Sequence, residues 1–365
     1  MNDVQQVPFS ESVCAEDPVV SAIVPCFKQA HYLPESVASL VAQDYPPLEI
    51  VIVNDGSPDN TSEVARQLIA QYPTTNIRLL EKENGGVSDA RNYAIARATG
   101  RILLTLDADD LVQPSFIHKG LQAMRETGAN FVCTYSEVFG EERDVWQPPD
   151  YEVYSIRYEN CVPTLSMFDR MFWEKSGGFK TAFPFNEDWE FWINCSRHDI
   201  VPYRLRGNFH LYRSTSTGLA HNYIKETWPI SVATMMTANQ DLYPASQVLW
   251  AHTQLAGIPD HWAEKFAEYS KMHDDQWLLK LWMGIYCEAR SKFDDALALY
   301  SVANQICGQT QWQILWRIGE ILRNRNMSRE AYQMLHMCRI LRPDTQTVLG
   351  DMIEELRQAG LRTTA

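Results

Sequence analysis

The sequence predicts an α/β domain built on a mostly parallel sheet, followed by an all-α domain of helical hairpins. Between about Val19 and Cys133, short apolar runs alternate with segments whose apolar residues recur at helical spacing. Alternation of strand and helix implies right-handed crossovers and parallel neighbouring strands. From about Tyr243 onward the periodic segments are helical throughout. The chain has 365 residues, which is long for a single core and fits two or three domains.

Each predicted strand is short and almost wholly apolar, as parallel strands buried on both faces should be. The first is β-branched and is expected to stop at Pro25, which cannot extend a ladder. Ligands of such open sheets bind beyond the carboxyl ends of the strands, which here selects the loops at residues 25–31, 54–60 and 107–110. The predicted elements are, in order, strand 19–24, helix 33–43, strand 49–53, helix 62–71, strand 77–80, helix 87–98 and strand 101–106.

Composition excludes several classes of function. The formal net charge of −14 disfavours nucleic-acid binding and broad adhesion to anionic lipid, because both need a basic surface. No apolar run approaches the roughly 20 residues that span a bilayer, and residues 1–18 are polar, without a signal-peptide core. We therefore expect a cytoplasmic, not transmembrane, protein with a flexible N-terminus at residues 1–18. The eight cysteines include no Cys-x-x-Cys pair, so neither a zinc site nor a disulfide framework is expected.

An apolar run that ends in three carboxylates, Asp107, Asp109 and Asp110, is the clearest chemical feature of the first half. Carboxylates at a strand end repel one another unless a cation joins them. Mg²⁺ and Mn²⁺ prefer oxygen ligands and commonly bind through one or two carboxylates together with substrate phosphates. An acidic turn is the alternative, because Asp is common where strands become turns.

The helical part contains an internal repeat. An offset of 35 residues (317 − 282) places residues 282–284 on 317–319 and Ala296 on Ala331. Residues 275–343 therefore resemble tetratricopeptide repeats, whose unit is about 34 residues. Two ordinary helical hairpins with coincidental spacing are the alternative. In either case the segment predicts a protein contact, as a homodimer interface or as a docking site for a protein acceptor.

Five segments of the first half follow one another in this order: VSAIVPCFK at 20–28, IVIVNDGS at 50–57, NGGVSDARN at 84–92, LDADD at 106–110, and GGF at 177–179 followed by NEDWE at 186–190. Taken together, they resemble the motifs of family-2 glycosyltransferases of the GT-A fold. The resemblance covers about residues 19–220. It implies a transferase domain at 19–240 built on a Rossmann-like mixed sheet, with a nucleotide-binding half at 19–133 and an acceptor half at 134–240, before a helical domain at 241–365.

The resemblance also implies which residues bind the donor. Asp55 would accept hydrogen bonds from the nucleotide, although it could serve only the Asp-Gly-Ser turn and the next helix cap. Gly85 and Gly86 let the backbone approach a ligand at a helix N-terminus. Arg91 would contact the nucleotide or diphosphate, and Arg213 the diphosphate. The implied donor-binding residues are Pro25, Phe27, Asp55, Arg91, Asp107, Ala108 and Arg213.

In the same resemblance, Asp107 and Asp109 form an Asp-x-Asp motif that holds Mn²⁺ or Mg²⁺. Direct displacement at the anomeric carbon inverts its configuration and needs a carboxylate to take the acceptor's proton. Asp188 is the implied catalytic base, and Glu187 is the catalytic neighbour that positions it or raises its pKa. An acidic first turn favoured by the helix dipole is the alternative for this pair.

The chain departs from the family pattern at the metal site. Thr215 stands near the position where the family often has a histidine that completes the site. His210, His221 or water could take that place, and a structural role is the alternative for both histidines. Trp189 and Trp192 could offer apolar surface to a sugar, although aromatic residues at helical spacing are more often core.

These features imply a metal-dependent inverting glycosyltransferase that moves a hexosyl or N-acetylhexosaminyl group. The expected donor is a nucleotide sugar, most simply a UDP-sugar, and the acceptor is a saccharide, a lipid-linked sugar or a protein. One alternative is a catalytically silent protein that binds partners through its helical tail, which the intact acidic residues disfavour. Another is a sugar nucleotidyltransferase, which residues 25–28 disfavour because they contain no glycine.

Overall fold

The computed structural model describes residues 17–43, 45–215 and 228–362. The chain divides into two compact units, residues 1–222 and 223–365. Most of the predicted flexible N-terminus, residues 1–16, lies outside the described part. Within the described ranges, no helix is both long enough and apolar enough to cross a membrane.

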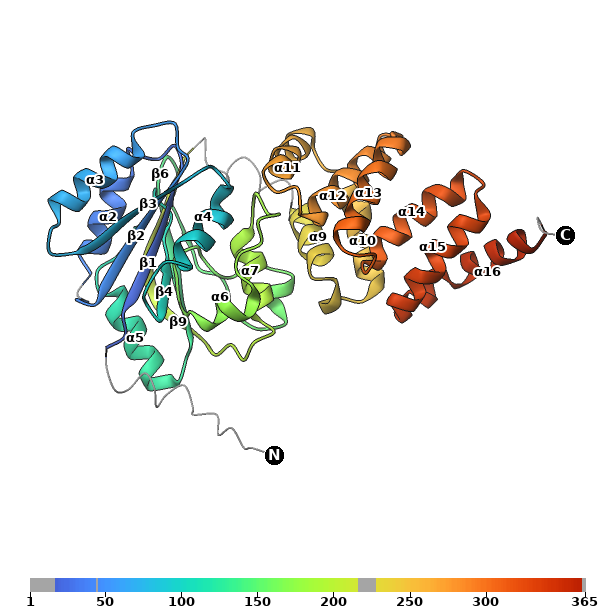
Figure 1. Cartoon of the computed structure of the whole chain (residues 1–365). Coiled ribbons are helices and arrows are strands. Elements are labelled where there is room, and N and C mark those ends of the chain that lie inside the picture. Colours follow the sequence, from blue (N-terminus) through green and yellow to red (C-terminus); the bar gives the residue numbers. More distant parts are fainter. Residues whose placement is uncertain (1–16, 44, 216–227, 363–365) are drawn as a thin grey trace, which may run out of the picture. The chain divides into compact units, whose positions relative to one another are not determined.

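The first unit is built on a mixed sheet (Figure 1), which the described residues form from nine strands in the order β3-β2-β1-β4-β8-β6-β9-β5, with β7 beside β6. Strands β1 to β4 pair in parallel, whereas β8 is antiparallel to both of its neighbours. This arrangement confirms the predicted GT-A-like mixed sheet. The strands are β1 (Val20–Cys26), β2 (Leu48–Asp55), β3 (Asn76–Lys82), β4 (Ile102–Thr105), β5 (Leu111–Val112), β6 (Phe131–Gly140), β7 (Asp144–Trp146), β8 (Ser166–Asp169) and β9 (Pro202–Ser214).

The prediction that the first strand stops at Pro25 is wrong, because β1 continues to Cys26. The carbonyl of Ile23 accepts a hydrogen bond from the amide of Leu106, on the β4 side of the strand. Alternate residues point the same way along a strand, so the nitrogen of Pro25 also faces that side. Pairing between β1 and β4 has already ended at Ile23 and Thr105, so the missing N–H of Pro25 removes no ladder bond.

Helices cover both faces of this sheet. Figure 1 shows α2 and α3 on one face and α4, α6 and α7 on the other. The core beneath α2 and α3 contains alternate β1 residues such as Ala22 and Val24, which pack with Leu33 and Leu40 of α2. The helices of this unit are α2 (Leu33–Val41), α3 (Thr61–Gln71), α4 (Gly86–Ile95), α5 (Phe116–Thr127), α6 (Met171–Ser176) and α7 (Glu187–Cys195), with a 3₁₀ turn at Ser155–Arg157.

The second unit is helical over all of its described length except for short turns, and it begins before the expected boundary at residue 240. Helix α9 packs against α10, and the Trp282 indole donates a hydrogen bond to the Thr237 hydroxyl, so α9 belongs with the helices that follow. The helices are α9 (Trp228–Ala238), α10 (Ala245–Leu255), α11 (Asp260–Met272), α12 (Trp277–Ala289), α13 (Phe293–Ile306), α14 (Trp312–Asn324), α15 (Ser328–Leu341) and α16 (Gln346–Arg362), with 3₁₀ turns at Gln240–Leu242 and Pro343–Thr345.

The repeat expected from the sequence is present as two helical hairpins. Helices α12 and α14 begin 35 residues apart (312 − 277), and so do α13 and α15 (328 − 293). In each hairpin a glycine of the first helix touches the second, because a Cβ on Gly284 would lie 2.3 Å from the Tyr300 ring and one on Gly319 would lie 2.7 Å from Leu335. The second member of each pair also differs by 35 (335 − 300), so sequence spacing and packing agree.

Candidate active site

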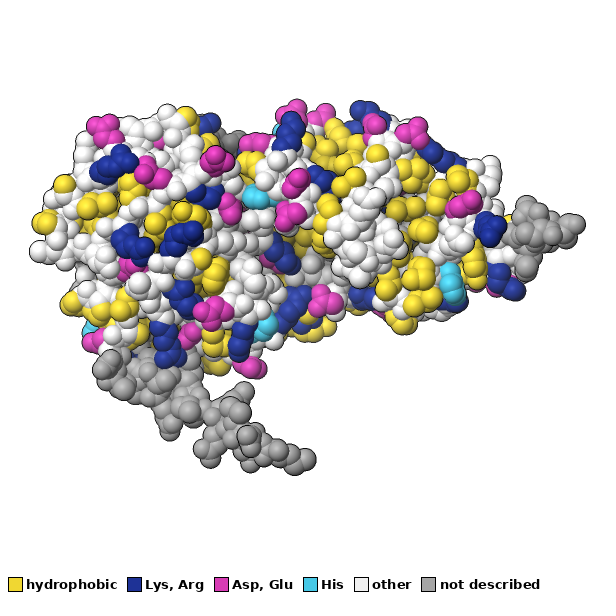
Figure 2. Space-filling view, in the orientation of Figure 1, with side chains coloured by type: hydrophobic (Ala, Val, Ile, Leu, Met, Phe, Trp, Pro, Cys, Tyr) yellow, Lys and Arg dark blue, Asp and Glu magenta, His cyan; other side chains and the backbone are white. Residues whose placement is uncertain are grey.

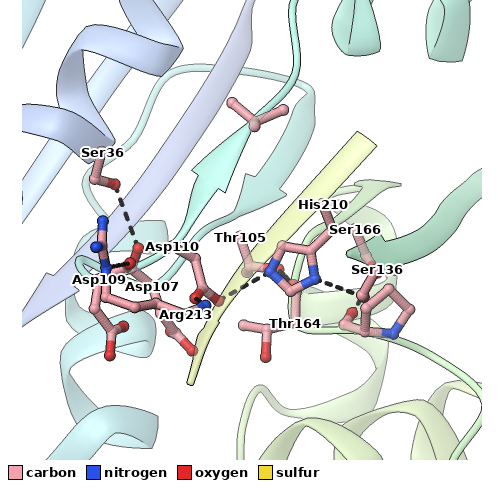
Figure 3. Close-up of polar contacts among 12 residues, drawn as sticks. Ser36, Thr105, Asp107, Asp109, Asp110, Ser136, Thr164, Ser166, His210 and Arg213 are labelled. Atoms are coloured by element: carbon pink, nitrogen blue, oxygen red, sulfur yellow. Dashed lines mark hydrogen bonds and ion pairs between the residues drawn. The ribbon is translucent and has the colours of Figure 1, made fainter. Parts of the chain in front are cut away.

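The acidic loop after β4 is anchored by its last carboxylate (Figure 3). Asp110 is buried, and its two oxygens contact His210 Nε2 at 2.9 Å and the backbone N–H of Arg213 at 2.8 Å. The other ring nitrogen of His210, Nδ1, lies 2.8 Å from the Ser136 hydroxyl. Both nitrogens of His210 are therefore engaged, so this histidine supports Asp110 and is not free to bind a metal. Burial raises the pKa of Asp110, and His210 opposes that rise.

Asp109 differs from its neighbour because its carboxylate makes no hydrogen bond or ion pair with another side chain of the described residues. Burial, followed by the charges of Asp110 and Asp107, raises the pKa of Asp109 to about 8, and Arg213 only partly offsets them. A carboxylate with this much uncompensated negative charge around it favours a bound cation. Asp109 is therefore the carboxylate of this loop with the most to gain from a bound cation, and its role as a metal ligand stays a prediction.

Arg213, near the end of β9, holds the same loop from the other side. Its Nε donates to the backbone carbonyl of Asp109 at 2.8 Å, and its Nη2 pairs with Glu35 at 2.7 Å. The guanidinium also lies 4.5 Å from the ring centroids of both Tyr32 and Phe139. Arg213 thus stands beside the predicted metal loop, and its ion-pair partner Glu35 is exposed.

Asp55 is buried and bonded within the protein. Its carboxylate accepts hydrogen bonds from the backbone N–H groups of Gly85 (3.0 Å) and Gly86 (2.8 Å) and pairs with Lys82 Nζ at 2.8 Å. Lys82 also pairs with Asp89 at 2.7 Å. Asp55 therefore fixes the glycine turn that starts α4, and its nucleotide contact stays a prediction.

Arg91 joins the two acidic motifs. Its side chain is 1% exposed, and its terminal nitrogens contact Asp107 Oδ1 at 2.7 Å and Glu187 Oε1 at 2.5 Å. The guanidinium carbon lies 5.4 Å from the Phe179 ring centroid. The two carboxylates lie 80 residues apart in sequence (187 − 107), one in the loop after β4 and the other at the start of α7, so this arginine brings the acidic loop and the Glu-Asp pair together.

The Glu-Asp pair opens α7, so these two acids form the first turn of a helix. Asn186, which precedes it, has a left-handed backbone with φ of 56°, a conformation that asparagine tolerates better than most residues. Asp188 Oδ1 accepts a hydrogen bond from the N–H of Trp189 at 2.7 Å. Burial, followed by the charge of Glu187, raises the pKa of Asp188 to about 7, whereas Arg91 lowers it. A carboxyl group tuned to this range can exchange a proton near neutral pH.

Trp189 and Trp192 belong to the core. Both are buried, and the Trp189 indole donates a hydrogen bond to the Ile156 carbonyl at 2.6 Å. Trp192 packs on Phe131 and Phe168 with ring centroids 4.3 and 5.2 Å apart. Both tryptophans therefore have a structural role in the core.

The remaining predicted donor residues line the same edge of the sheet with different exposure. Pro25 and Phe27 lie at the end of β1, and Phe27 is exposed with Lys28 Nζ 5.1 Å from its ring centroid. Ala108 is buried between the two metal-motif carboxylates. Their contacts with a donor stay predictions.

The residues present fit a divalent ion held by two carboxylates. Across the described ranges, no group of three or more His, Cys, Asp or Glu side chains is arranged to hold a metal. Asp109, without a side-chain partner, and Asp107, with only one oxygen paired to Arg91, still form a suitable oxygen donor set for an ion that completes its shell with phosphates. Thr215 is described and half-buried, whereas His221 lies outside the described residues.

Two further residues, Asn92 and Glu35, support the site and were not predicted from the sequence. The Asn92 amide oxygen accepts hydrogen bonds from the Trp173 indole and the Phe179 N–H, both at 2.9 Å, and its nitrogen donates to the Phe179 carbonyl at 2.7 Å. Asn92 stands inside the matching segment 84–92, so a signal existed. Glu35 has no motif, and its pairing with Arg213 depends on tertiary structure alone.

Residues 21–188 match the family model described as glycosyl transferase family 2. An uncharacterized glycosyltransferase of Escherichia coli K12, YibD, is 35% identical over 129 residues, which cover 35% of this chain and 37% of that protein. Chondroitin synthase of Pasteurella multocida is 33% identical over 130 residues, which cover 36% of this chain and 13% of that enzyme. The matches therefore span little more than a third of the first relative and far less of the second.

A solved structure of TarS residues 1–349 from S. aureus, in complex with UDP-GlcNAc, superimposes with a TM-score of 0.51 at 16% sequence identity. The match covers 93% of this chain and 92% of that one. At this identity the likeness concerns the fold alone.

Proposed function

We propose that residues 21–188, which match the family model described as glycosyl transferase family 2, form a transferase domain, and that the protein transfers a sugar from a nucleoside diphosphate to an acceptor hydroxyl with inversion. The observation that carries the proposal is the buried Arg91, which contacts Asp107 and Glu187 together. It brings the expected donor-phosphate loop and the expected base onto one site.

Asp188 is the proposed base. As the acceptor oxygen forms its bond to the anomeric carbon, Asp188 takes the hydroxyl proton, and the bond from that carbon to the diphosphate oxygen breaks with its electron pair. The nucleoside diphosphate leaves from the opposite face, so the configuration inverts. The pKa of Asp188, raised to about 7, supports this role, because an ordinary Asp carboxylate would be a weaker base.

Asp109 and Asp107 are the residues that would hold a divalent ion. When bound, Mn²⁺ or Mg²⁺ supplies Lewis-acid stabilisation of the charge on the leaving diphosphate. Arg213 adds a positive charge beside the same loop. Its ion-pair partner Glu35 is exposed, so a donor phosphate can displace the Glu35 carboxylate and pair with Arg213. No protein nucleophile is required.

We propose a uridine nucleotide and a hexosyl or N-acetylhexosaminyl group as the donor. TarS was solved with UDP-GlcNAc, which makes UDP-GlcNAc a sensible first compound to test on this chain. The acceptor class stays open between a saccharide, a lipid-linked sugar and a protein. The helical hairpins of the second unit favour a role in protein contact.

The experiment that tests the proposal is a screen of nucleotide sugars for release of the nucleoside diphosphate. The purified full chain is incubated with each sugar and Mn²⁺, with and without EDTA. We expect one donor to be turned over in the presence of Mn²⁺ and not in EDTA. Turnover that is unaffected by EDTA would remove the metal role of Asp109 and Asp107. Failure of every donor both to bind and to react would instead favour a silent, partner-binding protein.

A further inference from the structure

Two consecutive residues of α4 hold the segment that leads to the base. Asn92 makes three hydrogen bonds, of 2.7 to 2.9 Å, to Phe179 and Trp173. A Cβ on Gly178 would lie 2.6 Å from the Asn92 amide oxygen. Because only glycine leaves room for the amide at this distance, the contact fixes the path of the chain at residues 178–179.

Arg91 holds the next part of the same segment. Its contact with Glu187 holds the first residue of α7, and its contact with Asp107 connects this residue to the acidic loop after β4. Both terminal nitrogens are engaged and the side chain is 1% exposed, so the guanidinium presents no free face to a ligand. Its Nε is buried and has no hydrogen-bond partner in the part of the chain that the structure describes, so the two terminal nitrogens make its contacts with carboxylates.

Charge explains why an arginine is required there. Asp107 and Glu187 are both partly buried and would repel each other, and a planar guanidinium with two terminal nitrogens can pair with both at once. A lysine keeps the positive charge but carries it on one ammonium nitrogen, so it can approach one carboxylate closely and not both. The geometry of the pair therefore depends on the guanidinium and not on charge alone.

From these contacts we propose that Arg91 and Asn92 are positioning residues that set the place of the base-bearing start of α7 relative to the Asp107–Asp109 loop, and that Arg91 does not bind the donor. This inference rests on the proposed function and assigns to Arg91 a different role from the donor contact implied by the family resemblance. A displacement of about 1 Å at a reacting group can cost about 100-fold in rate, so the bridge is expected to act on turnover more than on binding.

Three variants of the full chain test this proposal. Arg91→Lys keeps the charge and removes the second contact, whereas Asn92→Ala loosens the same segment without touching a carboxylate. Arg97→Lys is the matched control, because Arg97 is an exposed arginine beside α4 that stacks on Tyr93 at 3.5 Å from its ring centroid. Thermal unfolding confirms that each variant is folded before it is compared.

The first readout is hydrogen exchange of the backbone amides at residues 178–190, which needs no turnover. We expect exchange there to speed up about 10-fold or more in Arg91→Lys and Asn92→Ala, with the strands β1 and β2 unchanged and Arg97→Lys like the parent. Unchanged exchange at residues 178–190 in both variants would overturn the proposal, whether or not the protein is a transferase.

The second readout separates binding from turnover, using the donor found in the screen and Mn²⁺. We expect kcat to fall about 100-fold in Arg91→Lys while the donor Kd changes less than 3-fold. A donor Kd weakened more than 10-fold with kcat preserved would make Arg91 a donor contact and overturn the proposal. If the parent protein turns over no donor, the proposed function fails, and the exchange measurement alone decides the positioning role.

Discussion

The raised pKa of Asp188 predicts the pH below which the transferase activity should decrease. Three charged groups act on this carboxyl, of which Glu187 and Asp107 raise its pKa and Arg91 lowers it. The rise from the ordinary value of 3.8 to about 7 corresponds to about 4 kcal/mol against the charged form. As a base, Asp188 must be ionised, so kcat/KM should drop about tenfold per pH unit below 7 and be about 100-fold below its plateau at pH 5.

The variant Glu187→Gln tests whether protonation of Asp188 causes this fall of kcat/KM at acid pH, which is the acid limb of the pH profile. The substitution removes the neighbouring negative charge of Glu187, and it also removes one of the two carboxylates that pair with Arg91. Both effects lower the pKa of Asp188. The assay is kcat/KM for the donor against pH at saturating Mn²⁺, and the acid limb of the variant should move to lower pH by about one unit. An acid limb below pH 5 in the parent, or a limb that moves to higher pH in the variant, would refute the reasoning.

Three further predictions concern parts of the fold that carry the site or the helical unit. His210→Ala should destabilise the protein by about 3 kcal/mol, because it leaves one oxygen of the buried Asp110 carboxylate without a partner; denaturant unfolding measures this, and a change below about 0.5 kcal/mol would contradict it. Gly284→Ala should cost about 1–3 kcal/mol, since its Cβ would meet the Tyr300 ring at 2.3 Å; a Tm equal to that of the parent would show that the hairpin relaxes freely. Burial lowers the pKa of His252 to about 3, so in the unfolded chain this histidine takes up a proton below about pH 6.5 and in the folded chain it does not; the His252 contribution to the unfolding free energy should therefore fall by about 2 kcal/mol from pH 7 to pH 5, and the difference in unfolding free energy between the parent and His252→Gln, measured at both pH values, should change by that amount.

Local patterns were enough to predict most of the fold. The apolar strand runs and helical spacings identified β1 to β4 and the helices between them, and the offset of 35 residues located the hairpins of the second unit. The mixed character of the sheet followed only from the resemblance, because β8 is four residues long and pairs with strands distant in sequence.

The residues of the candidate site could be predicted from the sequence, whereas the contacts among them could not. Asp107, Asp188 and Arg91 were each named, yet the bridge that Arg91 makes to Glu187 spans 96 residues of sequence and no local pattern encodes it. His210 was a candidate metal ligand because sequence order placed it near the expected position. Its two hydrogen bonds, which depend on how β6, β9 and the acidic loop pack, give it a structural role instead.

Asp188→Asn tests the central claim most directly. The substitution keeps the size of the side chain and an oxygen that can accept the Trp189 N–H bond, and it removes the group that takes the proton. We expect the donor identified in the screen to bind with a Kd within about 3-fold of the parent, while transfer falls by at least 100-fold, in line with the loss of a general base. Transfer at the parent's rate in Asp188→Asn would contradict the account.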